Sequence, residues 1–333
     1  MASLDYPYPD TPAPGTSLEV APGVRWLSMP LPFALDHINL WIVGDTIVDT
    51  GIGDEKTREL WEKLLVETQI KRVVLTHYHP DHAGNAAWLV QKFAAEFWTT
   101  QGEYLTAHAV RASSAGYTTE AVLDVFRRNG LAAERAATMG GRGNRYAALV
   151  PDFPLSYRRI IEGDRVKMGG HEWRAFIGHG HAPEHLSLYC EALNVVIAGD
   201  MLLSTISTNV SVWSIDPEGD PLRLFLESLK RYRELPEDVL VLPSHGKPFR
   251  GAHERVAQLE SHHREHFDNL KKVLGQEKKS AAELLPVLFK RPLDAHQTFF
   301  AMGEAIAHLH YLYYAGRLKR ANGPDGIMRY AAS

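Results

Sequence analysis

The chain has 333 residues, of which 45% are hydrophobic and 23% are charged, and its formal net charge is −4. These values are typical of a globular protein with a large core, and the charge gives no whole-chain case for binding nucleic acid or an anionic membrane. We find neither a secretory signal pattern nor an apolar run near the about 20 residues that span a bilayer. We therefore expect a cytoplasmic protein without membrane contact. The single cysteine, Cys190, excludes an intramolecular disulfide framework and a cysteine-rich zinc site, and its apolar run predicts a buried strand residue.

The first part of the chain predicts strands followed by a helix and another strand. Residues 17–53 alternate apolar runs with turns, as antiparallel strands do. Residues 54–68 carry leucines and a tryptophan at helical spacing, and the aliphatic run 72–75 indicates a buried strand.

The segment that follows this strand carries four metal-capable side chains within six residues: His77, His79, Asp81 and His82. A helix is expected to begin just after it, so the segment would form the turn at a strand's carboxyl end, where open α/β sheets commonly place their chemistry. Imidazoles and a carboxylate packed this closely are typical ligands of borderline divalent metals. A polar loop with surface histidines is the weaker alternative.

The remainder predicts a helical insertion, a second set of strands and a C-terminal module. Residues from about 101 to 157 form the insertion, and Tyr104, Phe126, Tyr146 and Phe153 within it are candidate substrate contacts. Strands are expected at 165–168, 173–177, 186–189, 195–198 and 239–242, with helices at 222–233 and 253–274. Beyond residue 275, the sequence has a winged-helix outline of two helices and a hairpin. The helices are expected at 281–289 and 299–314, and the strands of the hairpin at 317–320 and 327–330. We therefore expect domains at 1–275 and 276–333.

The metal-capable segment looks like half of a two-metal site, because one loop cannot supply the ligands of two ions. The remaining ligands should therefore follow later strands. Three of the expected strands are each followed by a small residue and then by ligand-type side chains. These side chains are His179, His181 and His185 after the first strand, Asp200 after the second and His245 after the third. The pattern alone leaves open which of the three histidines is a ligand.

Over residues ~20 to 250, the Thr-His-x-His-x-Asp-His motif and its ordered downstream ligands resemble the metallo-β-lactamase superfamily. The tail makes the chain most similar to the glyoxalase II-like and lactamase-like members that carry a winged-helix-like domain. The resemblance implies a four-layered αβ/βα sandwich of two mixed sheets in the α/β (α+β) class. It also implies a first metal held by His77, His79 and His181, a second held by Asp81, His82 and His245, and Asp200 as the bridge between them.

This sequence departs from the family pattern at the third ligand, where relatives often have Thr-Pro-Gly-His. His181 keeps the usual spacing to the turn at Pro183, so we favour it over His179 and His185. The latter two are expected to line or support the pocket, or to be hydrogen-bonded histidines without catalytic duty. The aspartate that matches Asp49 supports the metal loop in the family, and we expect it to orient a ligand imidazole or Thr76.

The implied activity is hydrolysis by a hydroxide that bridges two divalent metals, with Asp81 and Asp200 as catalytic residues. Zinc is the first choice of metal, and iron or manganese also suit these ligands. The resemblance favours a small ester, thioester or lactone as substrate, as in hydroxyacyl-glutathione hydrolases and lactonases.

Two other functions remain open. Basic residues in the tail, among them Arg317, Lys319 and Arg320, would suit a metal-dependent endoribonuclease. A non-catalytic metal-binding sensor or scaffold is less favoured, because a complete dinuclear ligand set is unusual in a purely structural site. The long helix 253–274 and the tail could mediate a homodimer, although nothing in them requires it. On that helix, His253, His262, His263 and His266 are expected on a solvated face.

Overall fold

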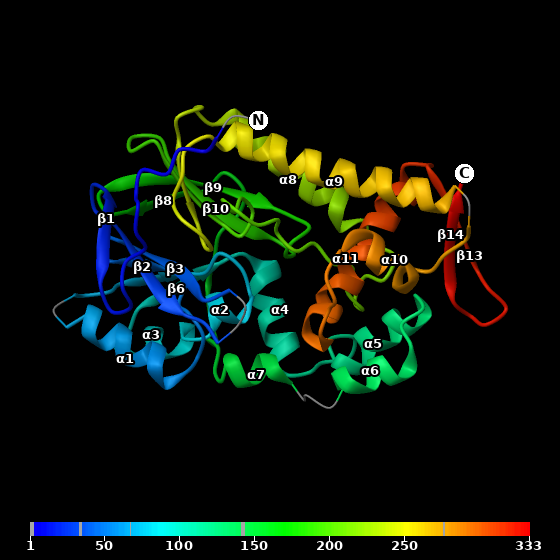
Figure 1. The fold of residues 1–333 in the computed structure, drawn as a ribbon. Helices are drawn as coiled ribbons and strands as arrows, with labels where there is room; N and C mark the ends of the chain where they lie inside the picture. Colours follow the sequence, from blue (N-terminus) through cyan, green and yellow to red (C-terminus); the bar gives the residue numbers. More distant parts are fainter. Residues whose placement is uncertain (1–2, 33–34, 67, 141–143, 276) are drawn as a thin grey trace. The chain divides into compact units, whose positions relative to one another are not determined.

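The structure is a computed structural model that describes residues 3–32, 35–66, 68–140, 144–275 and 277–333. The chain divides into two compact units, drawn in Figure 1. Unit 1 comprises residues 1–112, 145–208 and 228–256, and unit 2 comprises residues 113–144, 209–227 and 257–333. Among the described residues, no helix combines the length and the apolar character needed to cross a membrane.

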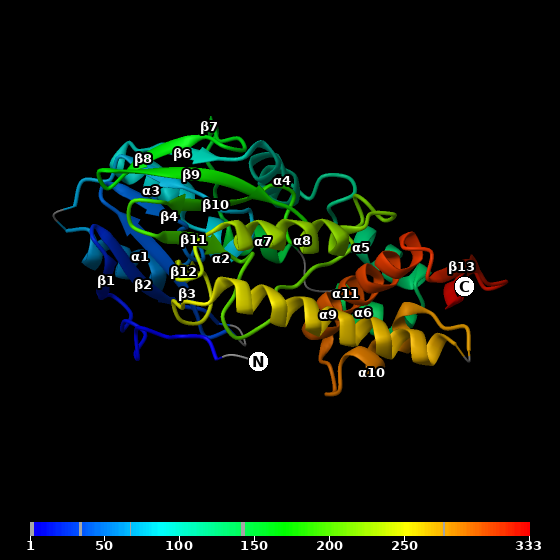
Figure 2. The same cartoon turned by 90° about the horizontal axis from the view of Figure 1, so that it is seen from above.

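Unit 1 contains two mixed sheets. The first has seven strands, in the order β1 (Ser17–Ala21), β2 (Val24–Pro30), β3 (His37–Val43), β4 (Thr46–Val48), β5 (Arg72–Val74), β6 (Glu96–Thr99) and β7 (Arg158–Arg159). The second has five, in the order β12 (Leu240–Pro243), β11 (Val195–Gly199), β10 (His185–Cys190), β9 (His171–Gly178) and β8 (Arg165–Met168) (Figure 2). Strands β4 to β7 are parallel, as are β11 and β12, and the other neighbours are antiparallel.

Alternating side chains give the first sheet two apolar faces. Trp26, Trp41 and Val74 point into a core that they share with residues of the second sheet, such as Trp173 and Leu188. Their neighbours along the strands point into a separate core with helices α1 (Glu55–Leu64) and α3 (Ala86–Phe93). On the outer face of the second sheet, the short 3₁₀ helix η1 (Arg231–Glu234) packs its Tyr232 against Phe176, with ring centroids 5.3 Å apart. The expected mixed α/β sandwich is confirmed, and Cys190 is buried in β10 as predicted.

The described part of the expected insertion contains the helices α4 to α7, which are divided between the two units. Helices α4 (Gln101–Arg111) and α7 (Arg145–Leu149) belong to unit 1, whereas α5 (Thr119–Arg128) and α6 (Ala133–Gly140) belong to unit 2. Helices α8 (Pro221–Lys230) and α9 (Ala252–Leu274) each supply residues to both units.

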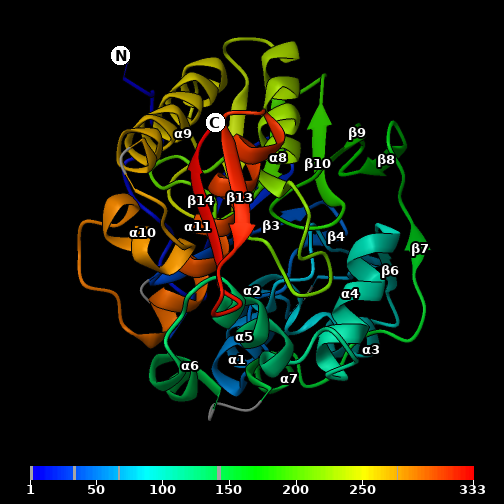
Figure 3. The ribbon, with the colours of Figure 1, turned by 90° about the vertical axis from the view of Figure 1, so that its right-hand side faces the viewer.

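The C-terminal part of unit 2 contains the expected helices and hairpin. They are α10 (Ala281–Leu288), α11 (Ala295–Tyr314), β13 (Leu318–Asn322) and β14 (Met328–Ala332), and Figure 3 shows the hairpin beside α11. Unit 2 also includes α5 and α6, so residues 277–333 pack with segments from earlier in the chain. The expected boundary between residues 275 and 276 stays a prediction.

Candidate metal centre

The metal loop begins where β5 ends. Strand β5 pairs in parallel with β4 and β6, which fixes the direction in which the chain leaves the sheet. The loop passes through His77 and His79 into the short helix α2 (Pro80–Ala83), and Pro80 stands at its first turn, where a missing N–H costs little. The first turn of α2 carries Asp81 and His82, so one connection presents four ligand-type side chains.

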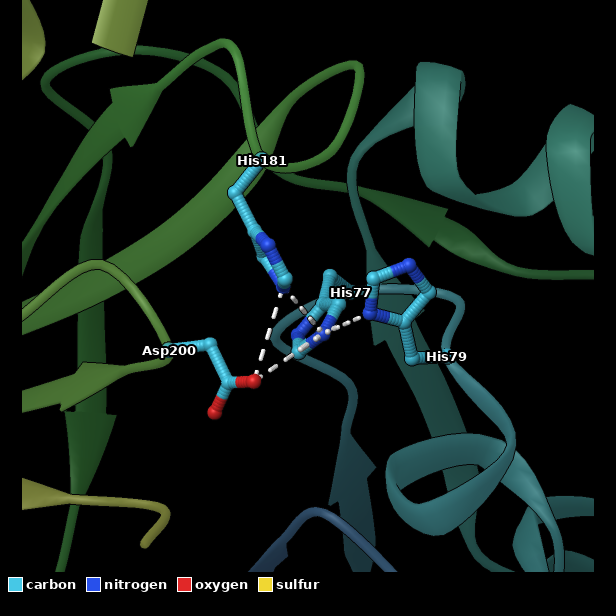
Figure 4. A group of neighbouring side chains, drawn as sticks. All are labelled: His77, His79, His181 and Asp200. Atoms are coloured by element: carbon cyan, nitrogen blue, oxygen red, sulfur yellow. Dashed lines mark hydrogen bonds and ion pairs between the residues drawn. The ribbon is translucent and has the colours of Figure 1, made fainter. Parts of the chain in front are cut away.

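The first group of ligand-type side chains contains three imidazoles from two loops. His77 Nε2 lies 2.9 Å from His79 Nδ1 and 3.2 Å from His181 Nε2 (Figure 4). His181 follows β9, as the sequence predicted for one of its three candidate histidines. The Asp200 Oδ2 atom, from the end of β11, lies 3.5 Å from His181 Nε2 and 4.0 Å from His77 Nε2. The ligand atoms of these four residues lie within 4.8 Å of one another, as ligands of a single ion would.

The second group lies on the other side of Asp200. It contains Asp81, His82 and His245, whose ligand atoms also lie within 4.8 Å of one another. His245 Nε2 is 3.3 Å from Asp81 Oδ2, and His82 Nε2 is 3.7 Å from the same oxygen. The Asp200 Oδ1 atom lies 3.6 Å from both imidazole nitrogens. The two oxygens of Asp200 therefore face different groups.

These side chains fit a pair of cations. Burial is the main cause that lowers the pKa of His77 far below its usual value and that of His79 to about 3, so both imidazoles are neutral and keep a lone pair for a metal. Burial alone would also lower the pKa of His82, but the Asp49, Asp81 and Asp200 carboxylates outweigh it and raise this pKa to about 10. These three carboxylates thus favour a positive charge at the His82 imidazole. Among the described residues, buried His82 Nε2 and Asp200 Oδ1 have no hydrogen-bond partner, and a metal ion would satisfy both.

Other contacts fix the orientation of the second group. Asp49 Oδ2 lies 2.7 Å from His82 Nδ1 and accepts a hydrogen bond from the Thr76 hydroxyl, also at 2.7 Å. A carboxylate only accepts, so His82 Nδ1 carries the proton and Nε2 is left to bind a metal. His245 Nδ1 likewise lies 3.1 Å from the His37 carbonyl oxygen. Asp49 contacts both partners that the sequence offered as alternatives, Thr76 and a ligand imidazole.

The two histidines beside His181 have different environments. His185 is fully buried, and its Nε2 accepts a hydrogen bond of 3.1 Å from the backbone N–H of Asp200. The close approach depends on Gly199, where a Cβ atom would lie 2.4 Å from His185 Cε1. His179 is exposed, and its Nδ1 lies 2.7 Å from the Pro183 carbonyl oxygen, outside both groups. His185 therefore positions Asp200, whereas His179 belongs to the loop.

Sequence reasoning missed Glu103, a buried residue of α4. Its carboxylate accepts hydrogen bonds from the backbone N–H groups of Tyr78, at 2.9 Å, and Glu184, at 2.6 Å. It thereby connects the metal loop with the loop after β9. A glutamate on an amphipathic helix is usually solvated, so its residue type gave no signal. Burial outweighs these hydrogen bonds and raises the pKa of Glu103 to about 8.

The aromatic residues expected to contact substrate all make contacts within the protein, and for Tyr104 and Tyr146 the expectation stays a prediction. Phe126 and Phe153 are buried in apolar cores, which makes that expectation wrong for both; Phe126 packs on Phe299 and Phe153 on Phe97. Tyr104 stacks on Tyr157 with ring centroids 4.0 Å apart. The Tyr146 hydroxyl donates a 2.6 Å hydrogen bond to the Tyr78 carbonyl oxygen, which ties α7 to the metal loop.

Two curated relatives are similar to this chain in sequence, and a solved structure has the same fold. The chain is 26% identical over 308 residues to "Probable metallo-hydrolase YqjP" of Bacillus subtilis, covering 86% of this chain and 91% of that protein. It is 24% identical to hydroxyacylglutathione hydrolase GloC of Haemophilus influenzae, covering 60% of this chain and 79% of the relative. The crystal structure of a β-lactamase domain protein from Burkholderia ambifaria has a TM-score of 0.93 and 46% identity, covering 99% of this chain and 98% of that one.

Family models match both parts of the chain. The model described as "Metallo-beta-lactamase-like, C-terminal domain" matches residues 267–333. The model of the metallo-beta-lactamase superfamily matches residues 36–245, a range that contains the whole ligand set described above. The chain is therefore a metal-dependent hydrolase and belongs to the metallo-β-lactamase superfamily.

Proposed function

We propose that this chain is a dinuclear hydrolase that cleaves a small ester, thioester or lactone. One observation carries the proposal: the two oxygens of Asp200 face separate ligand groups, with Oδ2 toward His181 and Oδ1 toward His82 and His245. A carboxylate in this position can bridge two ions, and no serine or cysteine nucleophile is then required.

Two divalent ions bound there would lower the pKa of a water molecule and polarise a carbonyl group of the substrate. The chain's own residues do the remaining work. His77, His79 and His181 would hold the first ion, and Asp81, His82 and His245 would hold the second. Asp81 also places a carboxylate beside His245, at 3.3 Å, where it can orient the attacking water. Asp49 keeps the proton of His82 on Nδ1 and so maintains the ligand nitrogen.

Two observations support an acyl substrate over RNA. One relative is named a hydroxyacylglutathione hydrolase, and such an enzyme acts on a thioester. In addition, several cations of the C-terminal part are already paired with carboxylates: Arg320 with Glu218, Arg329 with Asp325 and Lys279 with Glu277. These pairs reduce the positive charge that could attract phosphates.

An activity screen tests the reaction class. The metal-loaded chain is assayed on thioesters, lactones, phosphodiesters and short RNA, together with His181→Asn and the matched variant His179→Asn. We expect thioester or lactone turnover that falls at least about 100-fold in His181→Asn and is nearly unchanged in His179→Asn. Cleavage of RNA without acyl turnover would favour the endoribonuclease, and no turnover of any substrate would favour the sensor or scaffold.

We propose zinc as the metal, because imidazole and carboxylate ligands without thiolate suit it. Metal-depleted protein is reconstituted separately with zinc, iron(II) and manganese(II), and bound metal and turnover are measured for each. Highest activity with iron or manganese would overturn the choice of zinc while leaving the dinuclear hydrolase intact.

A further inference from the structure

Unit 2 contains a second concentration of histidines, at a distance in sequence from the metal loop. Helix α9 supplies His262, His263 and His266, and helix α11 supplies Glu304 and His308. All five residues belong to unit 2, where α9 and α11 also contact each other through Phe267 and Tyr311, whose rings stack with centroids 4.5 Å apart.

On α9, His263 and His266 do not lie on a solvated face, contrary to the expectation from the sequence. His263 and His308 are buried, with exposed fractions of 1% and 0%, and His266 is partly buried. His266 and His308 rings lie 5.1 Å apart, and His263 and His308 rings lie 5.2 Å apart. Packing imidazoles this closely in an apolar interior is costly unless their nitrogens have partners.

The hydrogen bonds of His308 leave it ready to bind a metal. Its Nδ1 lies 2.8 Å from the backbone carbonyl oxygen of Glu304, one turn earlier in α11. A carbonyl only accepts, so Nδ1 carries the proton and Nε2 presents a lone pair. Donation from the other ring nitrogen to a backbone carbonyl is the usual arrangement of a metal-binding histidine. His263 Nδ1 lies 3.1 Å from His308 Nε2, so a hydrogen bond between the two imidazoles is the competing interpretation.

That competing interpretation leaves part of the cluster without partners. Within the described residues, buried His266 Nδ1 and His263 Nε2 have no hydrogen-bond partner. The Glu304 carboxylate is partly buried beside them, and its Oε2 accepts a 3.1 Å hydrogen bond from Asn209. One ligand atom each from His266, Glu304 and His308 can lie within 4.8 Å of the others.

We propose that His266, Glu304 and His308 form a further metal site, which binds a divalent transition ion of the zinc type and joins α9 to α11. Two imidazoles and one carboxylate suit zinc or iron(II), and three protein ligands leave a position for water or for His263. Sites of this kind are built between facing helices of a bundle, with ligands one turn apart on a helix, as Glu304 and His308 are. His266 and Glu304 are not fully buried, which gives the ion a way in.

The first test measures zinc stoichiometry in the full chain. The unchanged protein, Glu304→Gln and His266→Asn are dialysed against buffered zinc and analysed for bound metal. Glutamine keeps the shape of Glu304 and can still accept from Asn209. We expect each variant to retain one zinc equivalent less than the unchanged chain. The matched variant His296→Asn, at an exposed position of α11, should lose none.

A second set of variants separates this site from the metal centre of unit 1. The substitutions His77→Asn and His82→Asn are combined, and zinc binding is measured with and without Glu304→Gln. We expect one remaining equivalent that Glu304→Gln removes. Folded variants with the same zinc content as their parents would overturn the proposal, whatever the fate of the metal centre in unit 1.

A crystal of the unchanged chain soaked in zinc covers the case in which these variants fail to fold. Anomalous scattering at the zinc absorption edge should show a peak between His266, Glu304 and His308. Peaks only among the ligands of unit 1 would show that the cluster in unit 2 is a set of hydrogen-bonded histidines.

Discussion

At Asp49 the backbone φ is +60°, a conformation that residues other than glycine rarely adopt. Such strain persists where the surroundings fix it, and here three hydrogen bonds do so. The carboxylate receives the Thr76 N–H at 2.8 Å and the Thr76 hydroxyl at 2.7 Å, in addition to His82 Nδ1. These contacts hold the imidazole of His82, a candidate metal ligand, in place.

Replacing Asp49 by asparagine should weaken metal binding by about 10- to 100-fold. The two carboxylate oxygens of Asp49 accept hydrogen bonds from Thr76 and His82, whereas an amide has only one oxygen that can accept. Asparagine tolerates positive φ, so the change mainly removes charge and one acceptor. Competition with a chelator measures the affinity. Asp54→Asn is the matched control: Asp54 caps α1 through the Thr57 N–H, and asparagine caps helices equally well. Equal affinities in the two variants would contradict the role of Asp49.

Gly199 offers a second test at the scale of one residue. Its φ of +55° and the contact with His185 both oppose a side chain, so Gly199→Ala should displace His185 and, with it, Asp200. Gly163→Ala is the control, since Gly163 has φ +82° and open space around its Cα. We expect the control to lose about 1–2 kcal/mol of unfolding free energy. Gly199→Ala should lose about 1–3 kcal/mol more and should also bind metal more weakly, as urea unfolding and chelator competition would show.

Among the elements, η1 is fixed to the second sheet by a charged contact. Arg231 donates two hydrogen bonds to Glu162, at 2.8 and 2.7 Å, and Glu162 also accepts the Ile177 N–H of β9 at 2.8 Å. Burial alone would raise the pKa of Glu162, but Arg231 and the Ile177 N–H outweigh it and lower this pKa. The stabilisation is therefore present above the unfolded pKa and is lost as pH falls through the lower folded pKa.

Glu162→Gln should accordingly lower the free energy of unfolding by about 1 kcal/mol at pH 7, a small value because Glu162 is half exposed and solvent screens the pair. The difference from the unchanged chain should shrink at pH 3, where the carboxylate gains a proton. Denaturant unfolding of the unchanged chain and of Glu162→Gln, both metal-free, measures this difference in unfolding free energy at each pH. Glu172→Gln removes an exposed ion pair with Arg165 and should have a smaller effect at pH 7. A pH-independent loss in Glu162→Gln would mean that the charge is unimportant.

The elements also show what the sequence could predict and what it could not. Strands with long apolar runs, such as β3 and β11, and the helix α1 were predicted because periodicity alone marks them. The short strand β7, Arg158–Arg159, was missed, since two exposed arginines become a strand only by pairing with β6. Helix α11 begins at Ala295, earlier than the predicted 299, because a capping box between Asp294 and Gln297 starts it.

The candidate site was more predictable than the fold around it, for a physical reason. Ligands must be histidines or carboxylates next to strand ends, so His77, His181, Asp200 and His245 stand out in the sequence, and the structure brings them together. The residues that orient them have no such restriction. Glu103 acts through backbone N–H groups, which any residue supplies, so only the three-dimensional structure reveals it. His185 was expected to line or support the pocket, but its contact with the Asp200 N–H is visible only in the structure.

Across unit 1 as a whole, the candidate metal centre joins the two sheets. Its ligands come from the loop after β5 in the first sheet and from the ends of β9, β11 and β12 in the second. Protein contacts already connect the sheets nearby: the Asn39 side chain donates to the Pro243 and Gly246 carbonyl oxygens, at 2.8 and 2.6 Å. Metal ions would add links between segments that are far apart in the sequence, and a ligand that binds only the folded state stabilises it.

Removing metal should therefore lower the unfolding temperature. At a free metal concentration 100 times the dissociation constant, one bound ion contributes about 2.7 kcal/mol to the free energy of unfolding. Calorimetry of the reconstituted and the chelator-treated chain measures the shift. The variant Glu304→Gln removes the proposed site of unit 2, so any metal-dependent shift in unfolding temperature that remains in it belongs to unit 1. Adding His181→Asn and His245→Asn to this variant should abolish the remaining shift. If that shift persists without these two ligands, metal does not stabilise unit 1 by linking its two sheets.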